Sequence, residues 1–346
     1  LQRIFDSRAM GAMENILRIY FIYFCSIYFT DAEDAITTPS IYIKPPVEHH
    51  NLTLVTALYD IHREKWPRFS RNQTKYHNDM KNVLRLRIPM VIFVDAKNHA
   101  FMKQAREEFG LSNITQIHLI PFEELPLYVH KEHIEKILQR ELAPGGWSPE
   151  WDEAMKTHPE SFSPEYDMLV NTKIHFLHTA MTENHFGTEF FSWIDAGFSH
   201  LYPEKWKRPG AFDWYPKFTR GKITMLKRTT NADKVTRYTL KDLYHKELPE
   251  VLNAGLIAGD NPSITKFNKL FYEELETLIK RDMIEDEQVV FVLVAAKHPE
   301  LFNLVEKDCG PDLFTKGDEC VVQGDAFDLL RRMRRFIQDT RNFLHI

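Results

Sequence analysis

Glycine and cysteine are scarce in this chain, and positive charge is not in excess. Of the 346 residues 13 are glycine, which argues against a fold built on many glycine turns. The three cysteines include no Cys-x-x-Cys pair and no zinc-type Cys/His spacing, which excludes a cysteine-based zinc site. The net charge of −5 gives no overall attraction to nucleic acid, so we expect no nucleic-acid partner.

Several common catalytic signatures are missing as well. The sequence contains no Gly-x-Ser-x-Gly, no Walker A and no Gly-x-Gly-x-x-Gly motif. These absences remove the commonest hydrolase, P-loop and Rossmann cofactor interpretations. The composition of 43% hydrophobic and 27% charged residues nevertheless predicts a globular core.

The longest apolar run is too short to span a bilayer. It covers residues 19–30 (IYFIYFCSIYFT), whereas a transmembrane helix needs about 20 apolar residues. Its length, with Arg18 before it and acidic residues after it, fits the apolar core of a signal peptide. A short signal anchor and a buried strand are the alternatives. We therefore expect a signal peptide or anchor over residues 1–32, a stem over 33–50, and membrane contact only if an anchor is retained.

Two further features favour a protein of the secretory pathway, in the ER or Golgi lumen or secreted. N-glycosylation sequons begin at Asn51, Asn72 and Asn113. The cysteines outside the apolar run are Cys309 and Cys320, which could form a disulfide in an oxidising lumen. Two buried free thiols are the alternative for this pair.

Apolar runs of strand length alternate with helical patterns along the chain. The expected strands are residues 52–58, 88–94, 115–120, 190–194, 223–226 and 251–258. The expected helices are residues 76–87, 100–109, 130–142, 168–181 and 263–280, with 289–296 helical or buried. Such alternation is typical of parallel strands covered on both faces. The sequence predicts one α/β domain over residues 51–322, with a mixed, mainly parallel sheet flanked by helices, and an amphipathic helix over 323–346.

Acidic residues directly follow two of the expected strands. Asp95 follows residues 88–94, and Asp195 follows residues 190–194. Ligands of open α/β sheets bind at the carboxyl ends of the strands, where a carboxylate can hold a divalent cation against a diphosphate. Gly197 would leave room for the close approach of a ligand. The alternative for each carboxylate is that it caps the turn that follows.

The surroundings of Asp195 resemble the HtrL/YibB family. The resemblance rests on residues 166–173 (YDMLVNTK), 184–188 (NHFGT) and 193–197 (WIDAG), supported by 56–61 (TALYDI) and 89–95 (PMVIFVD). It covers residues 52–305. The family is thought to be glycosyltransferase-like and is linked in bacteria to lipopolysaccharide assembly, so the resemblance implies a nucleotide sugar as donor and a glycan or glycoconjugate as acceptor.

The order of the later motifs is similar to that of GT-A glycosyltransferases. Residues 252–257 (LNAGLI) resemble the Asn-x-Gly strand after the metal motif, and residues 286–288 (DEQ) resemble the acidic-Gln pair that follows it. The usual Asp-x-Asp metal motif is Asp195-Ala196-Gly197 here, so one carboxylate is missing. A Mn²⁺ or Mg²⁺ site would need phosphates, His200 or His298 to complete it.

The resemblance implies roles for individual residues. Asp195 would hold the diphosphate, directly or through a metal, with Lys173 neutralising charge and contacting the sugar. Asn253 would bind sugar hydroxyls, and Glu287 or Asp286 would act as the base. The remaining candidates for nucleotide or phosphate contacts are Arg63, Asp95 and Gly197. The ordinary alternatives are a solvated lysine on a helix and acidic residues at an exposed helix N-terminus.

Two functions remain open from the sequence. One is the transfer of a sugar from a nucleotide sugar to a glycan or glycoconjugate. The other is a catalytically inactive relative that binds glycans or a protein partner in the same cleft, which the missing second aspartate favours.

Overall fold

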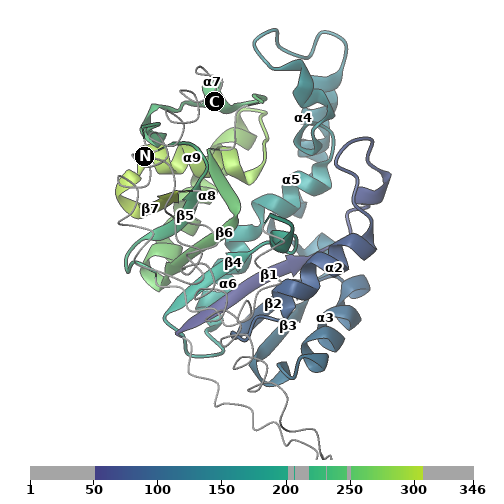
Figure 1. Ribbon diagram of the computed structural model, residues 1–346. Coiled ribbons are helices and arrows are strands. Elements are labelled where there is room, and N and C mark those ends of the chain that lie inside the picture. Colours follow the sequence, from purple (N-terminus) through teal and green to yellow (C-terminus); the bar gives the residue numbers. More distant parts are fainter. Residues whose placement is uncertain (1–50, 202–205, 207–217, 231, 248–250, 307–346) are drawn as a thin grey trace, which may run out of the picture. The chain divides into compact units, whose positions relative to one another are not determined.

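A seven-stranded sheet forms the centre of the molecule (Figure 1). The computed structural model describes residues 51–201, 206, 218–230, 232–247 and 251–306, all within the compact unit of residues 47–346. Its strands are β1 (Leu52–Leu58), β2 (Met90–Val94), β3 (Thr115–Leu119), β4 (Phe190–Ile194), β5 (Ile223–Lys227), β6 (Leu252–Asp260) and β7 (Phe302–Glu306). Their order in the sheet is β3-β2-β1-β4-β6-β5-β7.

Most of the strands run in the same direction. β1 is parallel to β2 and β4, β2 is parallel to β3, and β5 is parallel to β7. β6 is antiparallel to both of its neighbours, β4 and β5. The predicted α/β class with a mixed, mainly parallel sheet is therefore confirmed. The sequence patterns did not predict β7, a short strand at the edge of the sheet.

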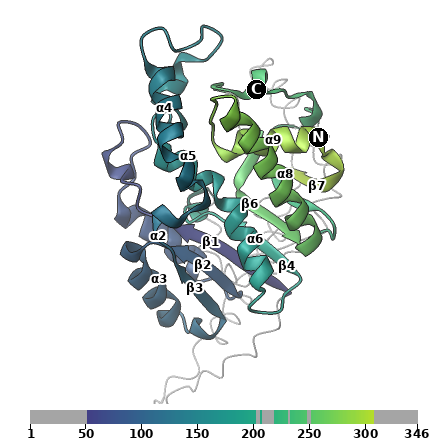
Figure 2. The same ribbon diagram turned by 180° about the vertical axis from the view of Figure 1, so that it is seen from behind.

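Helices cover both faces of the sheet (Figures 1 and 2). They are α2 (Gln73–Leu84), α3 (Ala96–Glu108), α4 (Lys131–Leu142), α5 (Pro164–Asn171), α6 (Lys173–Glu183), α7 (Leu240–Leu243), α8 (Asn261–Lys280) and α9 (Glu287–Lys297). One apolar cluster joins α2 and α3 to Leu54 and Ile92 of the sheet. The other joins α4, α5, α6, α8 and α9 to Val55 and Phe93. Because neighbouring residues of one strand enter opposite clusters, the strands read as continuous apolar runs.

Three expected helices differ from the observed ones in an informative way. The pattern over residues 168–181 is divided between α5 and α6 at Thr172, whose hydroxyl donates to the Met168 carbonyl at 2.7 Å. α8 begins earlier than expected because Asp260 is its N-cap, and Ser263 completes the capping box from inside the helix. Residues 289–296 lie in α9, which is buried nearly all round and therefore has no amphipathic period.

The chain changes direction across the sheet between β1 and β4. After β1 it continues to β2 and β3 on one side, and it then returns to place β4 on the other side of β1. The carboxyl ends of β1 and β4 therefore flank a topological switch point, where open α/β sheets bind ligands. The pairing of β4 with β6 sets Ile194 opposite Leu256, so the end of β4 lies beside the first half of β6.

Several expectations lie outside the described residues. These are the signal peptide or anchor, the stem, the Cys309–Cys320 pair and the helix over residues 323–346. Among the described residues, no helix is long and apolar enough to cross a membrane. The three sequon asparagines, Asn51, Asn72 and Asn113, are described and exposed.

Candidate functional site

A cleft of about 530 Å³ lies at the switch point of the sheet. Elements far apart in sequence form its walls, among them the ends of β1 and β4, the start of β6 and the N-terminal turns of α6 and α9. The predicted site residues that line it are Arg63, Lys173, Asp195, Gly197, Asn253, Asp286 and Glu287. The structure thus brings together all of the predicted site residues except Asp95.

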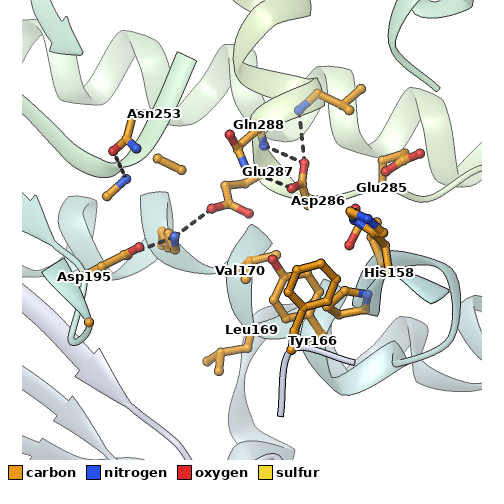
Figure 3. Close-up of a pocket in the computed structure, with 18 of the residues that line it drawn as sticks. His158, Tyr166, Leu169, Val170, Asp195, Asn253, Glu285, Asp286, Glu287 and Gln288 are labelled. Carbon is orange, nitrogen blue, oxygen red and sulfur yellow. Dashed lines mark hydrogen bonds and ion pairs between the residues drawn. The ribbon is translucent and has the colours of Figure 1, made fainter. Parts of the chain in front are cut away.

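Lys173 lies at the centre of the polar residues in the cleft. Its Nζ is 2.9 Å from Asp195 Oδ1 and 2.6 Å from Glu287 Oε1, so a single ammonium joins the end of β4 to the start of α9 (Figure 3). Its side chain is 10% exposed, compared with 36% for Asp195 and 3% for Glu287. The alternative of a solvated surface lysine is therefore excluded.

Trp193 of β4, two residues before Asp195, supports the same arrangement. Its indole Nε1 donates to Asp195 Oδ1 at 2.7 Å, and the Lys173 ammonium lies 5.8 Å from the centre of its ring. One oxygen of Asp195 therefore accepts both the indole N–H and the ammonium. These contacts fix the carboxylate in one orientation toward the cleft.

Burial and opposite charge act against each other on the groups of this cluster. Burial lowers the pKa of Lys173, but the stronger combined effect of Asp195 and Glu287 raises it above its usual value, so the side chain is an ammonium. Burial raises the pKa of Glu287, while Lys173 opposes this shift. A carboxylate with a raised pKa is a better proton acceptor when ionised, which suits a general base.

Asp286 and Glu287 are adjacent in sequence but make different contacts. Asp286 is the N-cap of α9, and its Oδ1 accepts from the backbone N–H groups of Gln288 and Val289 at 3.0 and 3.4 Å. Glu287 has one oxygen on Lys173, and its Oε2 has no hydrogen-bond partner among the described residues. Of the two candidate bases, Glu287 is therefore the one with an oxygen that is buried without a hydrogen-bond partner among the described residues.

Asn253 and Gly255 explain the Asn-x-Gly pattern of β6. Asn253 Oδ1 accepts from the Gly255 N–H at 2.8 Å, which leaves the amide hydrogens for a ligand. A Cβ on Gly255 would lie 2.8 Å from that same oxygen, 3.3 Å from Phe198 and 3.7 Å from Asp195 Oδ2. Glycine is thus needed so that β6, Asn253 and Asp195 can approach one another closely.

Two arginines line the cleft around Tyr76. Arg63 donates from Nη1 to the Tyr76 hydroxyl, and its guanidinium stacks 4.7 Å from the ring centre of Trp66. The Arg71 guanidinium lies 5.7 Å from the Tyr76 ring centre. Burial raises the pKa of Tyr76, while both arginines oppose this shift. These contacts place two cations together at the end of the first strand.

Asp95 has the capping role that was its alternative in the sequence. Its Oδ1 accepts from the Asn98 N–H at 2.9 Å as the N-cap of α3, and its Oδ2 accepts from the Asp60 N–H at 2.7 Å. It is not among the residues that line the cleft. A carboxylate at the end of a parallel strand is therefore not sufficient evidence of a ligand contact.

The sequence interpretation missed several polar residues of the cleft. Among them are Arg71, Glu160, Tyr166 and Gln288. Tyr166 and Gln288 lie inside motifs that carried the family resemblance, so those motifs held a signal for them. Arg71 was one of many basic residues in a polar loop, and Glu160 had no distinguishing pattern around it.

The donor atoms around Asp195 do not form a metal site. Among the described residues, the one group of three His, Cys, Asp or Glu side chains close enough to share an ion is Asp60, His62 and Glu64. Asp60 is already paired with Lys97 there. His200 lines the cleft but His298 does not. With Lys173 on Asp195 Oδ1, the expected Mn²⁺ or Mg²⁺ site does not fit the residues present.

A second buried network, formed by His245, Glu141 and Glu285, borders the cleft near Asp286 and Glu287. His245 Nε2 is 3.0 Å from Glu141 Oε2, and its Nδ1 is 3.1 Å from Glu285 Oε1, all three side chains being under 5% exposed. Burial lowers the pKa of His245, but the hydrogen bonds and charges of the two glutamates raise it to about 9. This network joins α4 to the segment before α9 and so supports the wall that carries Glu287.

The fold and the site together define an α/β protein with a charged cleft at the switch point of its sheet. The model of a family described as "Bacterial protein of unknown function (HtrL_YibB)" matches residues 50–334, and the chain belongs to this family. Protein HtrL of Escherichia coli (strain K12) is 24% identical over 259 residues, which cover 73% of this chain and 86% of that protein. The resemblance inferred from the motifs is thereby confirmed.

A solved structure also shares similarity with the chain. It is the crystal structure of mouse xyloside xylosyltransferase 1 in its apo form, with a TM-score of 0.38 and 12% sequence identity. The match covers 73% of this chain and 84% of that one.

Proposed function

We propose that the protein is a glycosyltransferase of the secretory pathway that moves a sugar from a nucleotide-sugar donor to a glycan or glycoconjugate. The observation that carries this proposal is that one cleft holds both cationic and carboxylate side chains. We call Arg63 and Arg71 its cationic part and Glu160 and Glu287 its carboxylate part, and Lys173 is paired with Glu287. A nucleotide sugar needs both, because a diphosphate links its nucleoside to a polyol sugar.

The cationic part suits the diphosphate. Arginine donates paired N–H groups in a fixed plane that matches phosphate oxygens. The aromatic rings of Trp66 and Tyr76 hold the guanidinium of Arg63, so little flexibility is lost when an anion binds. Charge that develops on a leaving diphosphate would be stabilised here by donors already in position.

The carboxylate part suits the sugar and the acceptor. Asn253 has amide hydrogens to donate, and Glu287 has a buried Oε2 atom that accepts no hydrogen bond from the described residues. In the proposed reaction the acceptor oxygen bonds to the anomeric carbon, and the bond from that carbon to the diphosphate oxygen breaks. Glu287 accepts the proton of the acceptor hydroxyl, and the diphosphate leaves toward the arginines.

The same cleft supports a second candidate function, binding without turnover. Glu287 and Asp195 each have one oxygen paired with Lys173. If these pairs persist when a ligand binds, neither carboxylate can act freely as a base or as a ligand contact. A relative that binds glycans or a protein partner without turnover would use the cleft with both of these ion pairs in place.

The exposed sequons support the lumenal part of the proposal. Asn72 and Asn113 both lie at the surface, where an oligosaccharide transferase could reach them. Buried sequons would have argued against glycosylation.

Nucleotide release from a panel of UDP- and GDP-sugars tests the function. We expect release with at least one donor, and a fall of about 10²–10³-fold in the Glu287→Gln variant. Glu276→Gln changes an exposed carboxylate of α8 and is the matched control. Donor binding in a thermal-shift assay without turnover would favour the second function. Failure of every donor to bind or react would refute the proposal.

A further inference from the structure

We propose that Arg63 and Arg71 hold the diphosphate of the donor directly, so that the site works without a divalent cation. This inference rests on the proposed function. It concerns how the leaving group is neutralised, and it assigns Asp195 the task of orienting Lys173.

The position expected for a metal is filled by a cationic side chain. Lys173 Nζ lies between Asp195 Oδ1 and Glu287 Oε1, at 2.9 and 2.6 Å. Asp195 Oδ1 also accepts the Trp193 indole N–H at 2.7 Å. A divalent ion on Asp195 would therefore lie next to an ammonium whose charge is fixed by two carboxylates, and like charges at this separation repel strongly.

Asp195 also lacks partners that would complete a coordination shell. In the part of the chain that the structure describes, Asp195 belongs to no group of three potential ligand side chains within reach of one ion. Mg²⁺ and Mn²⁺ prefer several oxygen ligands in a regular geometry. The residues that surround Asp195 instead donate hydrogen bonds to it, as a carboxylate that positions a lysine requires.

The arginines have the free charge that a diphosphate needs. Among the described residues, no carboxylate pairs with the guanidinium of Arg63 or Arg71. The Nε of Arg63 is buried without a hydrogen-bond partner in the same part of the chain. By contrast, the charge of Lys173 is already balanced by Asp195 and Glu287. Two guanidinium groups that no carboxylate of the described residues balances match the two or three negative charges of a diphosphate.

Gly197 places one of these arginines next to Asp195. A Cβ at Gly197 would lie 3.2 Å from Arg71 Nη1, so the guanidinium rests almost on the backbone two residues after Asp195. The guanidinium groups of Arg63 and Arg71 lie 5.6 and 5.7 Å from the Tyr76 ring centre, and burial and the charge of Asp195 both raise the pKa of the same tyrosine. The phosphates would therefore lie against Arg63 and Arg71 near the end of β4, while the sugar extends toward Asn253 and Glu287.

Isothermal titration of the full chain with UDP, GDP and inorganic pyrophosphate tests this inference, in EDTA and separately in Mn²⁺. We expect at least one nucleoside diphosphate to bind with the same Kd in both conditions. Arg71→Ala and Arg63→Ala should each weaken binding by about 10- to 100-fold in EDTA. Arg68→Ala changes an exposed arginine of the same loop outside the cleft and should leave Kd unchanged. Arg71→Lys should recover only part of the loss, because it keeps the charge without the planar fork.

The outcomes separate this inference from the function on which it rests. Binding of UDP or GDP only in Mn²⁺ would overturn the inference and leave the proposed glycosyltransferase intact. Unchanged affinity in a folded Arg63→Ala/Arg71→Ala variant would also overturn it. Absence of binding by any nucleoside diphosphate in both conditions would remove the proposed function as well. Circular dichroism melts of each variant show whether a loss of affinity comes from loss of the fold.

Discussion

Lys173 and Glu287 form a buried ion pair across 114 positions of sequence, with Nζ 2.6 Å from Oε1. The pair connects the start of α6 to the start of α9, and Asp195 at the end of β4 contacts the same ammonium at 2.9 Å. Three elements of the fold therefore meet at one charged atom. Both the proposed chemistry and part of the stability of the cleft depend on this atom.

Replacing Lys173 alone should lower the free energy of unfolding more than replacing Lys173 and Glu287 together. Lys173→Met leaves Glu287 buried and unpaired, which we expect to lower the free energy of unfolding by about 3–5 kcal/mol. Lys173→Met/Glu287→Gln should recover part of this loss because the unpaired charge is gone. The exposed pair Lys280 and Glu276 is the control, with an expected effect below about 1 kcal/mol. Urea unfolding of the wild type, Lys173→Met, Glu287→Gln and the double variant gives the coupling. A double variant less stable than Lys173→Met would contradict the explanation.

Asp195→Asn should reduce turnover much more than stability. Asparagine keeps the size and can still accept from the Trp193 indole, but it loses the charge that holds Lys173. We expect kcat to fall by about 10²–10³-fold. Asp95→Asn is a useful comparison, because this N-cap lies outside the cleft and asparagine caps a helix about as well as aspartate, so kcat and most of the stability should be retained. Wild-type turnover in a folded Asp195→Asn protein would refute the assigned role.

Gly255→Ala should disturb the site through contact with its neighbours. The added Cβ would lie 2.8 Å from Asn253 Oδ1 and 3.3 Å from Phe198, so Asn253 or the strand must move. We expect a loss of about 1–3 kcal/mol in thermal unfolding and weaker donor binding. Gly197→Ala should cost less stability, since its Cβ meets only the flexible end of Arg71, at 3.2 Å. Equal stability of Gly255→Ala and the wild type would show that β6 adapts without strain.

The His245 network should make stability depend on pH. The pKa of His245 is raised to about 9 in the folded protein by Glu141 and Glu285 against the effect of burial, whereas an unfolded histidine titrates near about 6.5. A raised folded pKa means that the stabilisation is fully present below about pH 6.5 and is lost as the pH rises through about 9. The contribution is on the order of 3 kcal/mol.

The His245→Gln variant isolates this contribution. We expect the difference in unfolding free energy between wild type and His245→Gln to shrink steadily from pH 6.5 to pH 9. Chemical denaturation across this range measures it. A difference that stays constant, or that grows with pH, would mean that the imidazole is neutral in the folded protein.

Secretion remains a prediction that the described residues permit. Expression of the full coding sequence in a eukaryotic secretory host should give a protein whose mass falls on glycosidase treatment. Asn72→Gln/Asn113→Gln should remove part of that change, because both asparagines are exposed sequon residues. An unglycosylated product retained in the cytosol would contradict the lumenal assignment.

The sequence by itself determined most of the secondary structure and the position of one key carboxylate. Apolar runs located β1 and β4 at their observed bounds, because strands buried on both faces must be apolar throughout. The same pattern placed Asp195 at the carboxyl end of β4, and the motif of Asn253 and Gly255 marked the part of β6 that approaches it. Each of these predictions depends on a pattern of only a few consecutive residues.

Only the tertiary structure decided what these residues face. The order β1-β4-β6 in the sheet brings Asn253 beside Asp195, and no local pattern contains that order. Asp95 and Asp195 have the same position after a strand, yet the first caps α3 and the second contacts Lys173. Burial likewise makes Lys173 a partner of two carboxylates instead of a solvated side chain. Pairing between distant segments and exclusion of water depend on the folded chain as a whole. The sequence could therefore indicate the candidate site residues, whereas their contacts follow only from the fold.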